Sequence, residues 1–176
     1  MFFSDPMPPP MDSEKTYELS IVYDNDLNQY LIRPLTLDDL ETVIKIDQDT
    51  WQKLAWPIDT FHNALNDPRA YSWVLETTTI DHSIVGYGMQ IVSGSNSNVT
   101  NLTLHPSQCG RGLGGLILRH MIEHARQLAM LSMTLEVDTS NIRAYNLYTK
   151  HGFAITHFLE NYYENQTDAY EMKLIL

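Results

Sequence analysis

The sequence predicts a single domain of the mixed α/β class, and three observations support this. Its 176 residues are close to the length of one typical domain of about 150 residues. Hydrophobic residues make up 43% of the chain and charged residues 19%, which suffices for a core and excludes disordered, collagen-like and coiled-coil chains. Runs of alternating hydrophobicity interleave with segments of helical periodicity, which indicates strands and helices within one domain.

The composition also predicts where the chain resides. No run approaches about 18 consecutive apolar residues, so we expect no membrane-spanning helix. The first residues show neither a basic leader nor an apolar stretch, so we expect no signal peptide. The single cysteine, Cys109, excludes a disulfide framework and a cysteine-built zinc site, and it favours a reducing, cytoplasmic location.

The chain divides into an extension and a domain. Residues 1–16 contain four prolines and few large apolar residues, and residues 1–28 as a whole are acidic. We therefore expect a flexible N-terminal extension over residues 1–28. A short apolar run at 19–23 could add an extra strand to the sheet. The domain itself is expected to span residues 29–176.

Four segments have helical signals. The first follows Thr36, an expected N-cap, and places Leu40, Val43 and Ile44 on one face. The last ends near Gly152, an expected C-cap. The predicted helices cover residues 37–47, 57–65, 112–128 and 140–152.

About seven segments have strand signals, and most are expected to pair antiparallel. A polar turn at 78–82 predicts a hairpin between the second and third strands, and a six-residue polar loop is expected at 93–98. In the fifth strand Met133, Leu135 and Val137 face one way, while Glu136 faces the other. The predicted strands cover 30–34, 71–77, 83–92, 99–104, 131–137, 153–159 and 169–174.

A glycine-rich loop joins the fourth predicted strand to the third predicted helix. It reads His-Pro-Ser-Gln-Cys-Gly-Arg-Gly-Leu-Gly-Gly over residues 105–115. Backbone N–H groups at a helix N-terminus, free of side chains, form a cradle for a pyrophosphate group. Arg111 adds a positive charge beside this cradle. The alternative is a glycine turn that only permits tight packing of the helix on the sheet.

Three kinds of anion-binding loop have glycine patterns with which this segment can be matched. A Walker loop is excluded because no Gly-Lys-Ser/Thr ending is present. A dinucleotide fingerprint is matched formally by Gly110, Gly112 and Gly115, but its glycines should follow the first strand of the chain. The third pattern, Gln/Arg-x-x-Gly-x-Gly/Ala, belongs to the acyl-CoA loop of the GNAT acetyltransferase superfamily. Residues 109–114 resemble it, except that Cys109 stands where glutamine or arginine is usual.

The resemblance extends from about residue 31 to residue 174 and is greatest to the ribosomal-protein-alanine N-acetyltransferase branch. It implies the GNAT acyl-CoA N-acyltransferase fold, with a mixed, mostly antiparallel sheet of about seven strands flanked by about four helices. The matching blocks, in chain order, are Ala55-Trp56 with Thr60-Phe61, residues 101–106, Leu135-Glu136-Val137 with Ser140-Asn141, Ala144 with Leu147-Tyr148, Gly152-Phe153, and residues 161–163 with Asp168-Ala169.

The same resemblance assigns roles to individual residues. It implies that Glu136 is the proton acceptor, that Tyr148 is the acid for the departing thiolate, and that Asn141 hydrogen-bonds the cofactor. Asn141 and Tyr148 lie seven residues apart, so they share one face of a helix. The other residues implied to bind acetyl-CoA are Leu102, Thr103, Leu104, Cys109, Gly110, Arg111, Gly112, Leu113, Gly114 and Gly115.

Three other signals favour structural roles. His120 and His124 with Glu123 spell the inverted zinc-protease pattern, but no third ligand is evident, so no metal site is predicted. Cys109 suits a small loop position better than a nucleophile. Trp51 and Trp56 could line an acceptor pocket, although core packing is the commoner use of such residues.

Together these features predict an acetyl-CoA-dependent N-acetyltransferase. By resemblance its acceptor is the N-terminal alanine of a small-subunit ribosomal protein, presented as a basic peptide. The net charge of −11 argues against nucleic acid as a direct partner, whereas residues 101–150, which hold the loop, carry +2. Another protein N-terminus, a lysine or a small amine stays open as the acceptor, as does a non-catalytic module that binds acyl-CoA or a dinucleotide. A monomer is plausible.

Overall fold

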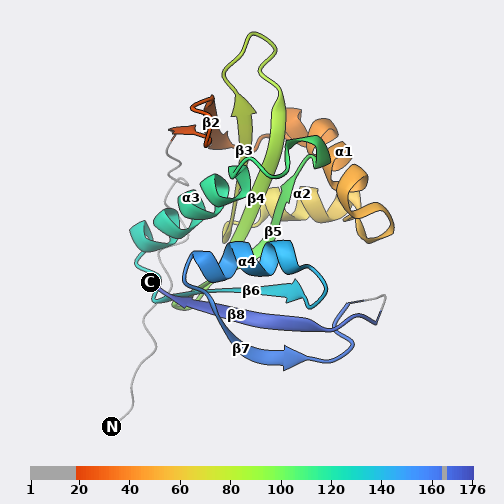
Figure 1. Cartoon of the computed structure of the whole chain (residues 1–176), viewed down its shortest axis with the longest axis vertical. Coiled ribbons are helices and arrows are strands. Elements are labelled where there is room, and N and C mark those ends of the chain that lie inside the picture. Colours follow the sequence, from red (N-terminus) through yellow and green to blue (C-terminus); the bar gives the residue numbers. More distant parts are fainter. Residues whose placement is uncertain (1–18, 164–165) are drawn as a thin grey trace.

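One eight-stranded sheet organises the molecule. The computed structural model describes residues 19–163 and 166–176, so the prolines of the predicted extension lie outside the described residues. The strand order is β1-β2-β3-β4-β5-β6-β8-β7, and Figure 1 shows the helices packed on both faces. Every neighbouring pair is antiparallel except β5 with β6. The strands are β1 (Ser20–Tyr23), β2 (Gln29–Pro34), β3 (Ala70–Thr77), β4 (Ile84–Ser93), β5 (Asn96–Leu104), β6 (Ser132–Asp138), β7 (Ala154–Leu159) and β8 (Ala169–Ile175).

Two features of the sheet differ from the sequence-based expectation. The sheet has eight strands rather than about seven, because the apolar run at 19–23 forms β1 and pairs with β2. The predicted boundary between residues 28 and 29 therefore falls between two paired strands. The polar loop expected at 93–98 is wrong: β4 ends at Ser93 and β5 begins at Asn96. Gly94, with φ of 57°, makes this tight turn possible, since glycine adopts positive φ without strain.

The four predicted helices are all present. The first begins as a 3₁₀ turn, η1 (Leu37–Asp39), and continues as α1 to residue 51. Thr36 precedes it, and its backbone N–H and its hydroxyl both donate to the Asp39 carboxylate. The remaining bounds are α1 (Leu40–Trp51), η2 (Gln52–Leu54), α2 (Ile58–Asn66), η3 (Pro106–Gln108), α3 (Leu113–Gln127) and α4 (Ile142–Lys150). Every helix in the described part is too short or too polar to cross a membrane.

The helices form two layers, one on each face of the sheet (Figure 1). Successive strand residues point to opposite faces, so Trp73 and Leu75 join the core under α3 and α4, whereas Val74 joins the core under α1 and α2. In β6 the alternation is as predicted, with Met133, Leu135 and Val137 all buried.

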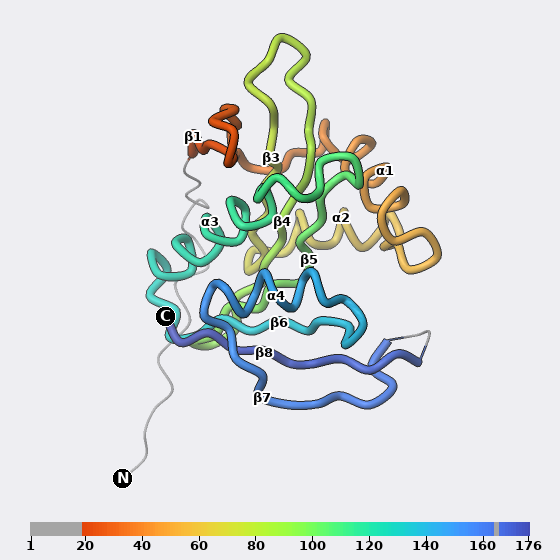
Figure 2. Tube along the Cα trace, viewed as in Figure 1, coloured from red at the N-terminus to blue at the C-terminus, as the bar shows by residue number. Residues whose placement is uncertain are grey.

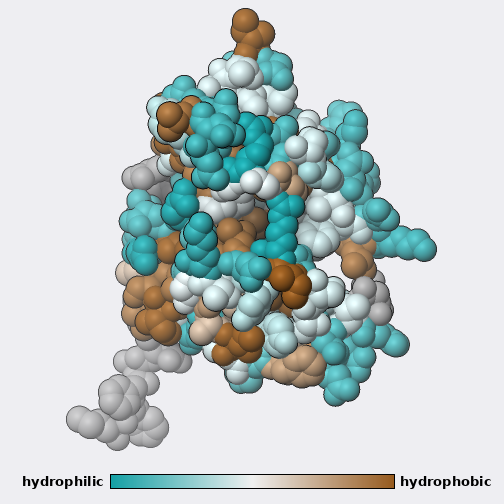
Figure 3. Space-filling model, in the orientation of Figure 1, coloured by the Kyte–Doolittle hydropathy of each residue, from teal (hydrophilic) through white to brown (hydrophobic). Residues whose placement is uncertain are grey.

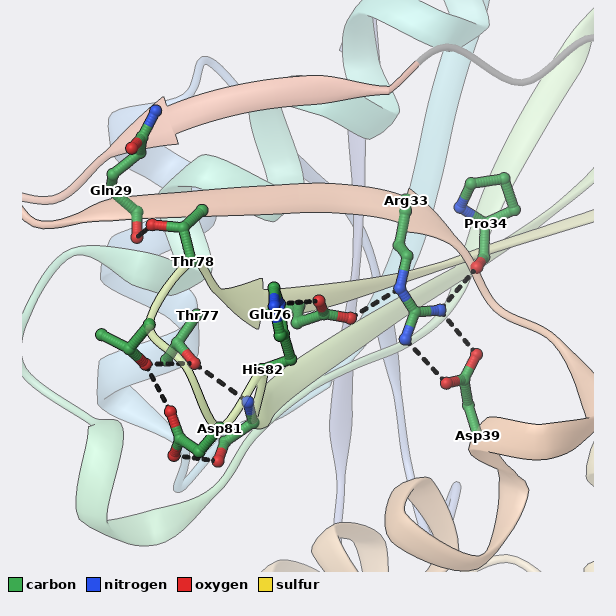
Figure 4. A network of polar contacts seen from close by, with 11 residues as sticks. Gln29, Arg33, Pro34, Asp39, Glu76, Thr77, Thr78, Asp81 and His82 are labelled. Carbon is green, nitrogen blue, oxygen red and sulfur yellow. Dashed lines mark hydrogen bonds and ion pairs between the residues drawn. The ribbon is translucent and has the colours of Figure 1, made fainter.

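A buried charge cluster ties the start of α1 to the sheet. Arg33 on β2 makes two hydrogen bonds to the Asp39 carboxylate, at 2.7 and 2.8 Å, and one to Glu76 on β3, at 2.6 Å. Figure 4 shows the guanidinium between these two carboxylates, with His82 on the far side of Glu76. The side chains of Asp39 and Glu76 are each only 9% exposed. The cluster therefore joins β2, β3 and the start of the first helix.

Candidate active site

The site begins where β5 and β6 separate. These strands pair only between Asn96–Asn98 and Ser132–Thr134, and beyond that point β5 stays with β4 while β6 stays with β8. Figure 2 shows the two strands running apart. Backbone N–H and C=O groups along the diverging edges thus have no partner in the adjacent strand. Such groups are strong hydrogen-bonding groups that an extended ligand can satisfy.

A β-bulge accounts for this divergence. Met89 pairs with Asn101 and Gln90 pairs with Val99, so Thr100 is an extra residue in β5. Its hydroxyl donates to the carbonyl oxygen of Met89 at 3.2 Å. A bulge bends its strand and increases the local twist, and this one lies two residues after the last residue that pairs with β6.

Helix α1 supports the end of β5. The indole N–H of Trp51 donates to the Thr103 hydroxyl at 2.8 Å, and that hydroxyl donates to Asn101 at 2.7 Å. Thr103 is buried, whereas Leu102 and Leu104 are half-buried. All three residues are predicted to bind the cofactor. The side-chain hydroxyl of Thr103, however, is already hydrogen-bonded to Trp51 and Asn101. Only its backbone remains for a ligand.

The glycine-rich loop leads from β5 into α3, as the sequence predicts. Gly110 and Gly112 have φ of 89° and 84°, which glycine adopts freely and other residues rarely do. Gly112 is the N-cap of α3, so the first backbone N–H groups of this helix lack intrahelical acceptors. Leu113 is fully buried, so only its backbone can serve a ligand.

The remaining glycines of the loop also have packing roles. A Cβ atom on Gly115 would lie 3.3 Å from the ring of His151, and one on Gly114 would lie 3.4 Å from Leu147. The sequence offered a cradle or a packing turn as alternatives. Gly114 and Gly115 have the packing role, because they let α4 approach α3. The cradle stays a prediction for Gly112, which lies at the N-terminus of α3.

Positive side chains surround the start of α3. A pocket of about 130 Å³ lies there, and its lining includes the cationic side chains of Arg111, Arg119 and Lys150 together with the imidazole of His151. Figure 3 shows this side of the molecule hollowed between α3 and α4, with hydrophilic residues on the rim. Cations beside a helix N-terminus favour a phosphate-bearing ligand. Cys109, which the resemblance implies to bind the cofactor, is half-buried, and its thiol lies 3.8 Å from the carbonyl oxygen of His105.

Glu136 lies on β6, in the part that has left β5. Its neighbour across the sheet is Glu171 on β8, and within the described residues it forms no ion pair. Burial raises the pKa of Glu136, the nearby charge of Glu171 raises it further, and a hydrogen bond from the Asn98 side chain opposes both effects. A carboxylate with a raised pKa binds a proton more readily, which suits a general base.

Tyr148 lies in α4, and its ring centroid is 5.9 Å from that of Phe153. Burial raises its pKa to about 12, so the phenol keeps its proton at neutral pH. Among the described residues no hydrogen-bond partner of its hydroxyl is found, so the hydroxyl can donate to a ligand. Asn141 is the N-cap of α4, and its side-chain oxygen accepts from the N–H of Ala144 at 3.1 Å. Its side-chain N–H₂ group remains for a ligand.

Two residues beside Glu136 had no predicted role. Glu171 raises the pKa of Glu136. Burial raises the pKa of Tyr163, and the nearby charges of Tyr162, Asp138, Glu136 and Tyr148 raise it further. The block at 161–163 marked this segment in the sequence, but nothing in the pattern assigned a function to it.

Other signals have structural explanations. His124 is buried, with its ring 4.8 Å from that of Trp73 and its Nδ1 3.0 Å from the Gln90 amide. Trp56 packs on Phe61 at 5.6 Å. The dinucleotide interpretation of the loop fails, because a doubly wound fold requires a mostly parallel sheet and this sheet has one parallel pair.

The geometry has the features of an acyl-CoA-type site: a helix N-terminus lined by cationic side chains adjoins two diverging strands. Comparison with known proteins agrees. A model of the acetyltransferase (GNAT) family matches residues 37–153. The chain therefore belongs to the GNAT acetyltransferase family and is an acetyl-CoA-dependent N-acetyltransferase.

Individual relatives have similar descriptions. A Bacillus subtilis protein named as a candidate ribosomal protein bS18-alanine N-acetyltransferase is 31% identical over 141 residues, covering 78% of this chain and 90% of the relative. An N-alpha-acetyltransferase of Sulfurisphaera tokodaii is 28% identical, covering 82% and 92%. The crystal structure of the ribosomal-protein-S18-alanine N-acetyltransferase from Escherichia coli superposes with a TM-score of 0.74 at 26% identity, covering 83% and 93%.

Proposed function

We propose that this protein is an N-alpha-acetyltransferase that transfers acetyl from acetyl-CoA to the N-terminal alanine of a small-subunit ribosomal protein. The observation that carries the proposal is the arrangement of Glu136, with its raised pKa, on the strand that diverges from β5. The names of the relatives support the acceptor class.

The cofactor would bind along the diverging edges. Backbone N–H groups of the glycine-rich loop would hold the pyrophosphate, and Arg111 would add charge. The backbone of residues 102–104 would hold the pantetheine arm and the thioester carbonyl. Asn141 would donate a hydrogen bond from its side-chain amide.

The reaction is a direct attack of the amine on the thioester. An α-amino group has a pKa of about 7.7–8.0, so Glu136 can remove its proton, directly or through water. The amine nitrogen forms a bond to the carbonyl carbon, and a backbone N–H of β5 stabilises the oxyanion. The C–S bond then breaks, and Tyr148 donates its proton to the departing sulfur.

The acceptor would approach the side of the sheet that carries Glu136. A basic peptide fits the acidic balance of the chain, whose net charge is −11. A cytoplasmic monomer that binds neither a membrane nor nucleic acid directly completes the proposal.

The test is mass spectrometry of the N-terminal peptide of ribosomal protein bS18 after incubation with the protein and acetyl-CoA. A single acetyl group on the α-amine is the expected product. The matched control is the same peptide with a blocked N-terminus, which should stay unmodified. Acetylation of internal lysines only, or of the blocked peptide, would overturn the acceptor assignment, and absence of any turnover would favour a binding module.

A further inference from the structure

The turn between β1 and β2 lies against the glycine-rich loop. A Cβ atom on Gly112 would lie 3.2 Å from the side-chain nitrogen of Asn25. Tyr23, Asp24 and Asn25 line the same pocket as Arg111 and Gly112. Because 87 residues separate Asp24 from Arg111 in sequence, this contact is a product of the fold. The turn also precedes residues 37–153, which match the family model.

Asp24 is the centre of this contact. Its carboxylate is fully buried and accepts a hydrogen bond from Arg111 at 2.8 Å. It also accepts from the backbone N–H groups of Asp26 and Asn28, both at 2.9 Å, and from the Tyr30 hydroxyl at 3.3 Å. Burial alone would raise the pKa of this carboxyl, but the hydrogen bonds from Asn28, Asp26 and Arg111 lower it to about 2. Asp24 is therefore a fixed anion at neutral pH.

This anion holds Arg111 in one place beside the cradle. The guanidinium donates to Asp24 and to Gln108, the latter at 2.7 Å, and it lies over the ring of Tyr30 at 5.8 Å. A guanidinium has five N–H donors, so donors remain for a phosphate. An arginine that is already ordered loses less side-chain entropy when a ligand binds.

We infer that the β1–β2 turn is one wall of the phosphate-binding part of the cofactor site, and that Asp24 is a positioning residue that acts through Arg111. The inference rests on the proposed use of acetyl-CoA and adds a segment to its site. Asp24 itself would repel a phosphate, so its contribution depends on Arg111. Asn25 contributes by placing its side-chain amide over Gly112.

The experiment compares acetyl-CoA with S-acetyl-pantetheine, which has the same thioester but no phosphate. Asp24→Asn should raise KM for acetyl-CoA about 10-fold through loss of preorganisation. It should leave kcat/KM for S-acetyl-pantetheine unchanged within about twofold, because that substrate does not reach Arg111. Asp26→Asn, a matched change in the same turn, should leave both substrates unaffected. In an Arg111→Gln background, Asp24→Asn should add no further loss, as a double-mutant cycle requires for coupled residues.

Several outcomes would overturn the inference. An equal loss for both thioesters would mean that Asp24 only stabilises the fold, and an unchanged KM would mean that it has no role. Additive losses in the Arg111→Gln background would exclude action through Arg111. If Asp24→Asn does not fold, Asn25→Ser tests the turn as a wall of the site, since it leaves every bond of Asp24 intact and should still raise KM for acetyl-CoA selectively. An unchanged KM in that variant would exclude the turn from the site. Failure of the wild-type protein to bind acetyl-CoA would instead reject the proposed function.

Discussion

Asp39 and Glu136 lie in opposite halves of the sheet, and each is close to a second carboxylate, but the two have opposite surroundings. In the N-terminal half, Asp39 and Glu76 share the guanidinium of Arg33 (Figure 4). In the C-terminal half, Glu136 lies opposite Glu171. Glu171 has Thr156 and His157 as partners, whereas Glu136 has no ion pair among the described residues. The pKa of Asp39 is lowered, because hydrogen bonds from Arg33 and Thr36 outweigh burial. The pKa of Glu136 is raised by burial and by its like-charged neighbour.

The difference separates a structural cluster from a chemical one. A carboxylate that is paired with a cation holds structural elements together and has a lowered pKa. A buried carboxylate without such a partner destabilises the fold and has a raised pKa, so it is a stronger base. Because a raised carboxyl pKa means that the folded state disfavours the charged form, Glu136 should destabilise the fold as pH rises through its titration. We therefore expect substitutions in the two clusters to have opposite effects on stability and activity.

Glu136→Gln tests the chemical cluster and should have the largest effect. Loss of the base should lower kcat about 10³-fold, within the range typical of general bases. The free energy of unfolding should be unchanged or higher, since an unfavourable buried charge is removed. Steady-state kinetics and chemical denaturation measure the two quantities, and binding of acetyl-CoA is the control that should not change. A kcat close to that of the wild type would remove Glu136 from the mechanism.

Arg33→Met tests the structural cluster. Without the guanidinium, two largely buried carboxylates lose the cation that they share, and the free energy of unfolding should fall by about 3 kcal/mol. The matched control is Arg69→Met, because Arg69 pairs with Asp67 on the surface at 58% exposure and should cost less than about 1 kcal/mol. In both variants kcat per folded molecule should persist. A larger loss for the surface pair would contradict the distinction between the clusters.

The pH dependence of stability sharpens the same test. The pKa of Asp39 is lower in the folded state than in the unfolded state. Asp39 therefore stabilises the fold at pH values above its unfolded-state pKa, and this stabilisation is lost as the pH falls through its folded-state pKa. Arg33→Met should flatten the acid side of the stability profile, followed by thermal unfolding between about pH 5 and pH 2. An unchanged acid slope would show that Arg33 is not what lowers this pKa.

Tyr148→Phe removes a hydroxyl beside the chemical cluster without adding charge. We expect kcat to fall about 10²-fold, at the lower end for proton donors, while the aromatic contact with Phe153 persists. The unfolding transition is the control for packing. A purely structural tyrosine would show the reverse pattern, with a lower unfolding midpoint and normal turnover.

Several features of the fold and of the candidate site could be predicted from the sequence. Periodicity located all four helices and the alternation around Glu136, because each depends on near neighbours in the chain. The glycine-rich loop could be predicted because backbone positions with positive φ, such as 110 and 112, are usually occupied by glycine, which is visible in the sequence. The resemblance supplied the roles of Glu136 and Tyr148, which remain predictions.

The parts that escaped prediction depend on contacts between distant segments. The turn at Gly94 replaced an expected loop because strand pairing extended through polar residues such as Asn96 and Asn98. The position of Glu171 beside Glu136 follows from strand register, which no local pattern encodes. The same holds for Asp24 and Arg111, which only the folded sheet brings together.

Glu171→Gln should have the smallest effect and bears most directly on the comparison. Removing this charge should lower the pKa of Glu136, because Glu171 contributes to raising it. The acidic limb of the pH profile of kcat/KM should therefore move to lower pH, while kcat on the alkaline side changes by less than about twofold, since Glu136 is ionised there in both proteins. The matched control is Glu123→Gln, which removes one charge from the exposed side of α3 and should leave the limb in place. If the acidic limb moves to higher pH, or moves equally in both variants, the charge of Glu171 does not raise the pKa of Glu136. Burial alone would then account for the difference between Glu136 and the Arg33 cluster.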